Sequence, residues 1–327
     1  MHVLLVTPSD RREGFEYVYS GRENLGVEYL LAALRATGVE AKSRNENIPG
    51  TLLAEDTDLS RHDVIGFSLP FWEYRKRYVE SINRIAQRTD ALLLIGGHAS
   101  TIGAKYFLHK CPRLAGVVMG EGEETLVEIV RSLESRGTCE GVPGLMTRSG
   151  FEQRRELVEL DDLPFPHRDE LRQSLDSGLA VQEALVESTR GCTYRCSFCS
   201  IPPYYKHAHK KRWRERSVEN ICAELTQLVN SFPEVNLISF TDDNFMGFNS
   251  RFHDRAIRIA EHLHSLREDI VFEVVCRVDA VEPEPFARLA ELGMVGVYLG
   301  IESGVQRILD AFQKKTTVNQ NLRAVQI

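Results

Sequence analysis

At 327 residues the chain is long enough for two domains, and its content of 43% hydrophobic and 27% charged residues is that of an ordinary globular protein. A formal net charge of −7 gives no reason to expect nucleic acid or an anionic membrane as partner. No apolar run approaches bilayer-spanning length, and residues 1–6 lack the basic flank of a signal peptide. We therefore expect a cytoplasmic protein with no membrane partner, whose seven cysteines stay reduced and form no disulfide framework.

The first half of the chain alternates buried-strand and helix patterns. Continuous apolar runs predict strands at 2–6, 64–69, 91–95 and 116–119. Helical spacing of apolar residues predicts helices at 27–35, 74–87 and 124–133, with a loop opening at Gly96. Such repeats imply a Rossmann-like, doubly wound parallel sheet, which binds ligands at the carboxyl ends of its strands.

The loops after these strands carry no phosphate-binding fingerprint. No G-x-G-x-x-G follows the first strand, which disfavours a nicotinamide or flavin dinucleotide. The pair Gly120-x-Gly122 alone is more typical of a tight turn between a strand and a helix.

The second half repeats the same alternation after a linker. Strands are predicted near 185, 238, 273 and 297, with helices at 218–229, 252–266 and 285–292 and a further helix from about 305. A hairpin is predicted around Ser149-Gly150, followed by a proline-stiffened linker at 161–166. We divide the chain into a domain at 1–140, a hairpin and linker at 141–183, and a second domain at 184–327.

Three cysteines form the motif on which the functional interpretation depends. Cys192, Cys196 and Cys199 have C-x3-C-x2-C spacing directly after the predicted strand at 184–186. A four-iron cluster normally takes four thiolates, so three leave one iron open for a small molecule. A zinc site completed by His207 or His209 is the alternative, disfavoured because structural zinc sites usually pair their ligands.

Two acids follow the predicted strand at 237–240. Acidic side chains at the carboxyl end of a barrel strand face the active site. Asp242 and Asp243 are therefore candidate active-site residues, and capping the next helix is the alternative for either one.

The cysteine motif, with Phe198 before its last cysteine, resembles the radical S-adenosylmethionine (SAM) superfamily. The resemblance implies that the three cysteines hold a [4Fe–4S] cluster whose open iron chelates SAM through its amino and carboxylate groups. One electron then cleaves SAM to a 5′-deoxyadenosyl radical. The resemblance also implies a (β/α) barrel, of which this sequence covers about four of six units, so we expect a partial and apparently truncated barrel.

The same resemblance implies roles for residues outside the cysteine motif. Asp242 or Asp243 would contact the SAM amino group and Arg277 its carboxylate, and the segment with Glu302 and Ser303 would also contact SAM. The implied SAM-binding residues are Phe198, Asp242, Asp243, Arg277, Glu302 and Ser303. The basic stretch 207–216 is usual in this family, where Arg214 and Arg216 position anionic groups or hold the loop and Ser217 caps a helix, so nucleic acid is not implied.

Three segments of the first half, at 25–35, 95–101 and 116–126, look like the cobalamin-binding domain found before many radical SAM cores. The cobalt-ligating Asp-x-His-x-x-Gly motif is missing, and His98 does not fit it, so the lower axial ligand stays unassigned. Phe71 or Trp72 covers the lower corrin face or serves ordinary packing. The implied cobalamin-binding residues are Thr7, Ser68, Leu69, Gly96, Gly97, Gly120, Glu121 and Glu123.

Taken together, the resemblance implies a cobalamin-dependent radical SAM enzyme that methylates an unactivated carbon of a small molecule. Its electron would come from a donor such as flavodoxin or ferredoxin. The alternatives are a radical cyclisation or rearrangement, and a truncated, non-catalytic cofactor-binding protein or subunit. A methylthiotransferase is disfavoured, because only Cys111 and Cys139 lie upstream to form a second cysteine set. The sequence does not name the substrate.

Overall fold

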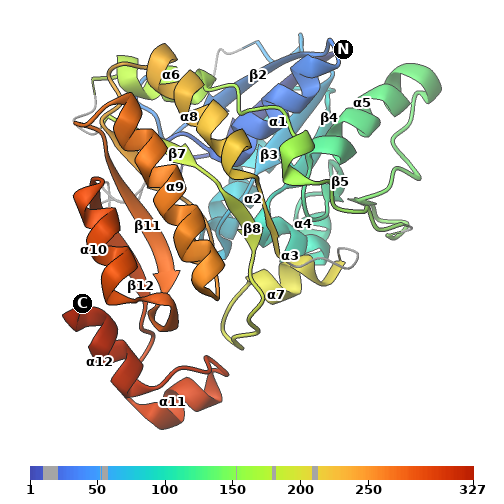
Figure 1. Cartoon of the computed structure of the whole chain (residues 1–327). Helices are drawn as coiled ribbons and strands as arrows, with labels where there is room; N and C mark the ends of the chain where they lie inside the picture. Colours follow the sequence, from blue (N-terminus) through green and yellow to red (C-terminus); the bar gives the residue numbers. More distant parts are fainter. Residues whose placement is uncertain (10–20, 52, 54–57, 152, 179–181, 208–212) are drawn as a thin grey trace. The chain divides into compact units, whose positions relative to one another are not determined.

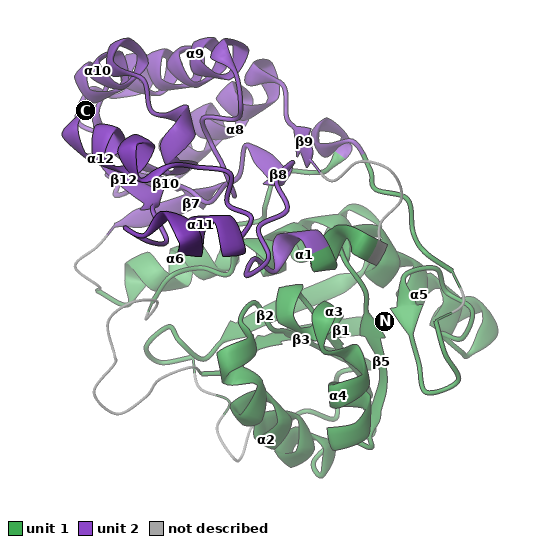
Figure 2. Cartoon of the chain, turned by 90° about the horizontal axis from the view of Figure 1, so that it is seen from below, with its two compact units in different colours: residues 1–158, 163–179, 203–210 green, residues 159–162, 180–202, 211–327 purple. Residues whose placement is uncertain are grey.

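The computed structural model describes residues 1–9, 21–51, 53, 58–151, 153–178, 182–207 and 213–327. The chain divides into two compact units, shown in Figure 2. Unit 1 comprises residues 1–158, 163–179 and 203–210, and unit 2 comprises residues 159–162, 180–202 and 211–327. Among the described residues, no helix is long and apolar enough to cross a membrane.

Unit 1 is built on a six-stranded sheet with the order β2-β1-β3-β4-β5-β6. The strands β1 (His2–Thr7), β2 (Glu40–Asn45), β3 (Val64–Ser68), β4 (Leu92–Gly96) and β5 (Leu114–Val118) pair in parallel. The short β6 (Leu145–Met146) joins the edge antiparallel to β5, and the turn after it returns to a bridge between Met146 and Phe151, at the predicted hairpin.

Helices cover both faces of this sheet (Figure 1). On one face α1 (Leu25–Ala36) and α5 (Glu123–Arg136) share a buried core with Val3 and Leu5 of β1. On the other face α2 (Arg75–Ala86), α3 (His98–Ile102) and α4 (Ala104–Lys110) share a core with Leu4 and Val6. Successive residues of β1 thus serve opposite cores, because side chains alternate along a strand. The predicted doubly wound fold is confirmed.

Helices α4 and α6 (Asp169–Asp176) were not predicted from the sequence, and two further features of unit 1 differ from expectation. The strand β2 alternates exposed and buried residues at the sheet edge, so it lacks the continuous apolar run that identified the other strands. The loop expected from Gly96 through Thr101 is mostly the short helix α3, which begins at His98 directly after Gly97 with its φ of 97°.

Unit 2 is built on a four-stranded parallel sheet with the order β12-β11-β10-β7. Its strands are β7 (Glu183–Val186), β10 (Leu237–Phe240), β11 (Val271–Arg277) and β12 (Met294–Gly300). The connecting helices are α8 (Val218–Ser231), α9 (Ser250–Leu266) and α10 (Pro283–Glu291), followed by α11 (Gln306–Ala311) and α12 (Val318–Gln326). The strands and the helices between them match those predicted for the second half of the chain, and β12 is an edge strand with Val295 and Tyr298 exposed.

The predicted linker is held to unit 1 by buried carboxyl groups. Its helix α6 (Asp169–Asp176) begins where Glu28 of α1 accepts the backbone N–H groups of Asp169 and Glu170, at 3.0 and 2.7 Å. Glu170 in turn accepts the backbone N–H of Asn24 at 2.7 Å and the side-chain amide of Asn45 at 2.9 Å. Burial raises the pKa of Glu28 to about 7 and that of Glu170 to about 8.

These raised pKa values predict that unit 1 loses stability as the pH rises. The folded state keeps the two protons more tightly than the unfolded chain, so their stabilisation is complete below about pH 4.5 and is lost as the pH rises through 7 to 8. We expect the free energy of unfolding to fall by on the order of 6 kcal/mol between pH 5 and 9, because each unit of pKa difference contributes about 1.4 kcal/mol. Glu170→Gln should remove a large part of that slope.

The two tryptophans allow unit 1 to be followed alone, because Trp72 lies in unit 1 and Trp213 in unit 2. In a Trp213→Phe background, urea unfolding followed by Trp72 fluorescence gives the midpoint at each pH. The control is Glu80→Gln, at an exposed position of α2. Equal pH slopes in Glu170→Gln and the control variant would contradict the prediction.

Candidate functional site

The three cysteines lie on one loop of unit 2, between β8 (Thr189–Gly191) and the short helix α7 (Ile201–Tyr204). Cys196 is buried, whereas Cys192 and Cys199 are partly buried. Burial raises the pKa of the Cys192 and Cys199 thiols, and the nearby Asp243 carboxylate raises both further. Without a cation, these thiols are therefore held in the protonated form.

This loop fits an iron–sulfur cluster, because bound iron supplies the positive charge that turns buried thiols into thiolates. Thiolates of a four-iron cluster bind different irons and need not converge on one point. In the described part of the chain, no group of three or more His, Cys, Asp or Glu side chains is spaced to hold a single metal ion. The side chain of His207 and the whole of His209, named in the zinc alternative, lie outside the described residues.

Arg277, at the end of β11, packs beneath the cysteine loop. Its side chain is nearly buried, and its Nη1 lies 3.8 Å from the Sγ of Cys196. Its Nε and Nη2 donate to the two carboxylate oxygens of Asp279 at 2.8 and 2.9 Å. The Tyr194 ring covers the guanidinium, with its centroid 3.4 Å from Cζ. Sequence analysis missed Tyr194 and Asp279, although the Arg277-Val-Asp279 spacing is a signal for a local ion pair.

The two acids after β10 occupy different surroundings. The fully buried carboxyl group of Asp242 accepts the backbone N–H and hydroxyl of Ser188, at 3.1 and 2.6 Å, and the hydroxyl of Thr189 at 2.5 Å. Asp243 accepts the backbone N–H of Gly191 at 3.1 Å, one residue before the first cysteine. Burial and the neighbouring Asp242 raise the pKa of Asp243 to about 6.

Neither acid caps the following helix. Helix α9 begins at Ser250, and the side chain of Asn249 accepts the backbone N–H of Arg251 at 3.1 Å. Asp242 therefore joins the end of β10 to the strand that leads into the cysteine loop, while Asp243 lies beside the loop itself.

The segment after β12 also reaches the cysteine loop. Glu302, with a φ of 61°, accepts a hydrogen bond from the Nζ of Lys314 at 3.0 Å. Lys314 is nearly buried, and its Nζ lies 5.8 Å from the centroid of the Phe198 ring. Phe198 packs against Phe312 at 5.1 Å between ring centroids. Ser303 accepts the backbone N–H of Val305 at 3.1 Å.

The structure thus brings the cysteines, Asp243 and Arg277 to one edge of the unit 2 sheet, with Phe198 and Glu302 joined to them through the segment at 312–314. Lys314 was missed because a single lysine in a polar tail carries no pattern. Its contacts depend on segments more than a hundred residues apart in sequence.

The described part of the basic stretch makes contacts within unit 2. Arg216 pairs with Glu224 of α8 and donates from Nη1 to the backbone oxygen of Glu187 at 2.9 Å. Trp213 packs edge-on against Phe252 at 5.0 Å, and Arg214 is buried in the same short ribbon, β9 (Trp213–Glu215). Arg216 therefore holds the entry to the cysteine loop, where β9 pairs with β8 at Arg214 and Arg190, and residues 208–212 lie outside the described residues.

In unit 1, the predicted cobalamin-binding residues lie at the carboxyl edge of the sheet. Thr7 ends β1 and Ser68 ends β3, the pair of strands where the strand order reverses. The Nδ2 of Asn24, which caps α1, lies within hydrogen-bond distance of both hydroxyl groups, at 3.0 Å from Thr7 and 3.2 Å from Ser68.

The next loops along this edge are tied to one another by backbone contacts. The Leu69 N–H donates to the Gly96 oxygen at 2.9 Å, and a Cβ at Gly97 would lie only 2.7 Å from the Leu69 oxygen. Gly120 has a φ of 76°, and its N–H donates to the Thr101 hydroxyl at 3.0 Å. A Cβ at Gly120 would meet nothing within 4 Å. The edge therefore offers bare backbone for the close approach of a ligand.

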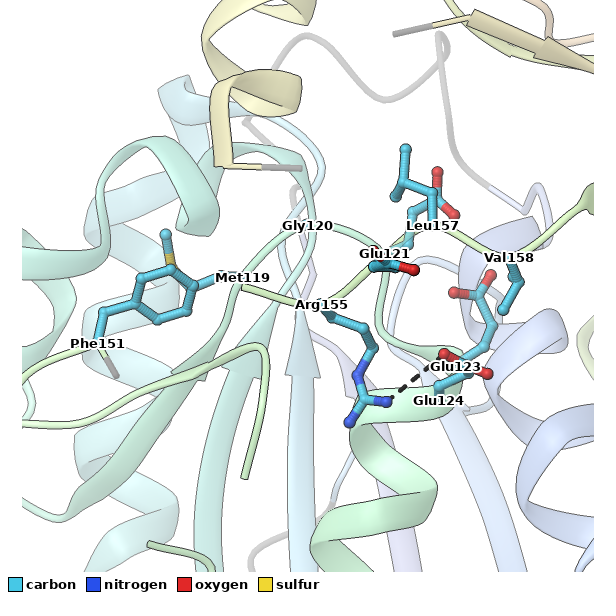
Figure 3. A pocket seen from close by; sticks show the side chains of 10 residues that line it. Met119, Gly120, Glu121, Glu123, Glu124, Phe151, Arg155, Leu157 and Val158 are labelled. Atoms are coloured by element: carbon cyan, nitrogen blue, oxygen red, sulfur yellow. Dashed lines mark ion pairs between the residues drawn. The ribbon is translucent and has the colours of Figure 1, made fainter. Parts of the chain in front are cut away.

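A pocket opens beside this edge (Figure 3). Gly120, Glu121 and Glu123 line one side of it, and Arg155 of the other side pairs with Glu124 at 3.5 Å. The other lining residues are Met119, Phe151, Glu156, Leu157 and Val158. The lining is therefore half charged, with Gly120 as its one glycine.

The aromatic residues near this edge pack against one another. The His98 ring stacks on Tyr204 at 4.4 Å, with 12° between the ring planes. Trp72 lies edge-on to Tyr106 at 5.4 Å between ring centroids, although about 40% of it is exposed. Phe71, equally exposed, lies edge-on to Tyr74 at 6.2 Å.

Models of two known protein families match this chain, one in each half of the sequence. The model of the radical SAM superfamily matches residues 186–327, and that of the B12 binding domain matches residues 17–130. The chain is 28% identical to an uncharacterised methyltransferase of Pyrococcus horikoshii, over 99% of this chain and 70% of the relative. It is 26% identical to the hopanoid C-3 methylase of Methylococcus capsulatus, over all of this chain and 62% of that protein.

A solved structure has the same fold. The cobalamin-dependent SAM radical enzyme OxsB, with aqua-cobalamin and SAM bound, matches with a TM-score of 0.80 at 25% identity. The match covers 99% of this chain and 47% of that one, so this chain spans about half the length of OxsB. The cysteine loop on a parallel β/α sheet agrees with the two family models: the chain combines a B12-binding domain with a radical SAM domain.

Proposed function

We propose that this protein is a cobalamin-dependent radical SAM enzyme that methylates an unactivated carbon of a small-molecule substrate. The observation that carries the proposal is the cysteine loop, whose buried and partly buried thiols lie beside an acid and two buried cations at one sheet edge. The names of the two sequence relatives, a methyltransferase and a methylase, favour methylation over cyclisation or rearrangement. They also disfavour a non-catalytic carrier or subunit.

In this proposal Cys192, Cys196 and Cys199 hold a [4Fe–4S] cluster, and the loops at the carboxyl edge of unit 1 hold cobalamin. When bound, these groups supply the one-electron cleavage of SAM and a carrier for its methyl group. The electron would come from a low-potential donor such as flavodoxin or ferredoxin in a reducing cytoplasm.

The residues around the cysteine loop would bind SAM and exclude water from it. Asp243, with a pKa of about 6, is largely ionised at neutral pH and can accept a hydrogen bond from the SAM amino group. Within the described ranges it accepts one hydrogen bond, from Gly191, which leaves acceptor capacity because a carboxylate has about four lone-pair sites. Phe198, Arg277, Glu302 and Ser303 remain the other SAM-binding candidates. Asp242 would act indirectly, by holding Ser188 and Thr189.

Cluster binding is the first test. After anaerobic reconstitution, we expect about four irons and four sulfides per chain, and none in the Cys192/Cys196/Cys199→Ala variant. Cys222→Ala is the matched control, because Cys222 is a partly buried free thiol on α8 away from the loop. Iron, sulfide and zinc assays provide the measurement. Zinc in place of iron would contradict the proposal.

Methyl transfer can be tested before the substrate is known. The reconstituted protein with cobalamin is reduced and supplied with SAM carrying an isotopic label in its methyl group. We expect the label in the cobalamin fraction and 5′-deoxyadenosine among the products, read by mass spectrometry. Deoxyadenosine with unlabelled cobalamin would reject methylation and leave cyclisation or rearrangement.

The two neighbouring acids should respond differently to the same change. Asp243→Asn should weaken SAM binding about tenfold, or about 1.4 kcal/mol, because a charge at the ligand is lost while the fold is kept. Asp242→Asn should instead lower the free energy of unfolding by about 1–3 kcal/mol, because its buried hydrogen bonds are disrupted. Calorimetric SAM binding and urea unfolding separate the two effects. SAM affinity unchanged in Asp243→Asn would remove this residue from the site.

A further inference from the structure

Resting on the proposed cluster, we infer that Arg277 is a positioning residue that raises the reduction potential of the cluster through the Cys196 sulfur, with Asp279 limiting the effect. Neither the family models nor the names of the relatives assign this role. The inference concerns the charge at one ligating sulfur and does not require the substrate or cobalamin.

The contacts of Arg277 leave one side of its guanidinium directed at Cys196. The Nε and Nη2 of Arg277 donate to the Asp279 carboxylate in a bidentate ion pair. Nη2 also donates to the backbone oxygen of Lys314 at 2.9 Å. Nη1 is the nitrogen that lies 3.8 Å from the Cys196 sulfur. Both residues are more than nine-tenths buried, so water does not compete strongly for this contact.

The orientation of the guanidinium is fixed from several sides. The Arg277 backbone N–H donates to the side-chain oxygen of Asn244 at 3.2 Å, which holds the end of β11. The Tyr194 ring lies flat over the guanidinium at 3.4 Å, and its hydroxyl donates to Asp279 at 3.3 Å. Because Tyr194 and Cys196 lie on the same loop, the stacking also positions the sulfur relative to Nη1.

The physical consequence follows from charge. A hydrogen bond and a positive charge at a ligating sulfur stabilise the more electron-rich, reduced cluster and raise its potential. The Asp279 carboxylate offsets part of that positive charge. Removing the Arg277 charge should therefore make the cluster harder to reduce, and removing the Asp279 charge should make it easier to reduce.

This role differs measurably from binding of the SAM carboxylate. An arginine that only anchors SAM would change SAM affinity and leave the potential of the SAM-free cluster unaltered. A residue that only supports the fold would not produce opposite shifts on removal of opposite charges. The sign of the shift in the absence of SAM is therefore the decisive measurement.

The chain offers a matched control. At the other end of β11, Arg267 and Asp269 have the same Arg-x-Asp spacing and the same bidentate ion pair, at 2.9 and 3.1 Å. This pair lies near the surface, and Arg267 has no cysteine among its hydrogen-bond partners. Arg267→Gln removes an equal charge from an equal ion pair away from the cluster loop.

The experiment is a redox titration of the reconstituted full chain without SAM, with dithionite as the one-electron reductant. The reduced cluster, which holds one added electron, is followed by electron paramagnetic resonance. In Arg277→Gln the ratio of reduced to oxidised cluster at a fixed potential should fall about tenfold, a negative shift of about 59 mV for one electron. Asp279→Asn should shift the midpoint in the positive direction, and Arg267→Gln should match the wild type.

Each other result has a definite meaning. Four irons per chain with unchanged potentials in Arg277→Gln and Asp279→Asn would overturn this inference and leave the proposed function standing. Shifts of the same sign in both variants would also overturn it. If Arg277→Gln assembles no cluster, the Asp279→Asn variant provides the test. A positive shift of its midpoint potential supports the inference, and an unshifted potential overturns it. A wild-type chain without iron would overturn the proposed function and this inference with it.

Discussion

Parallel strand pairing is the constraint on which both candidate sites depend. In a parallel sheet every strand ends at the same edge, so residues far apart in sequence meet there. In unit 1 this edge gathers Thr7, Ser68 and Gly97. In unit 2 it gathers the cysteine loop with Asp243 and Arg277, which follow or end β10 and β11. The covering helices occupy the faces and leave that edge to the loops.

Buried charge separates supporting residues from candidate binding residues. Asp242 and Glu170 are both fully buried, where an ionised carboxyl group is costly unless hydrogen bonds compensate it. Asp242 accepts hydrogen bonds from Ser188 and Thr189, and Glu170 from Asn24 and Asn45, so both hold segments together even though burial raises the pKa of each. Asp243 accepts the backbone N–H of Gly191, and its carboxylate has further acceptor sites for a ligand.

The cysteine loop is held by segments that come from several parts of unit 2. Gly191 contacts Asp243, the Cys196 sulfur contacts Arg277, and the Ser197 N–H donates to the Phe312 oxygen at 2.8 Å. The loop is therefore held by contacts within the chain, and its sulfurs lie beside charges of both signs. Such an environment can set both the affinity for a cluster and its potential.

The sequence by itself determined the alternation of strands and helices, the two domains and the cysteine motif, because apolar periodicity and ligand spacing are local properties of the chain. The edge strand β2 was not predicted, because only one of its faces is buried and it has no continuous apolar run. Tertiary structure alone decided that Asp242 turns inward while Asp243 faces the loop, and that Lys314 and Tyr194 join the site. Those assignments depend on contacts between residues that are distant in sequence. Such contacts leave no periodic pattern in the sequence from which they could be predicted.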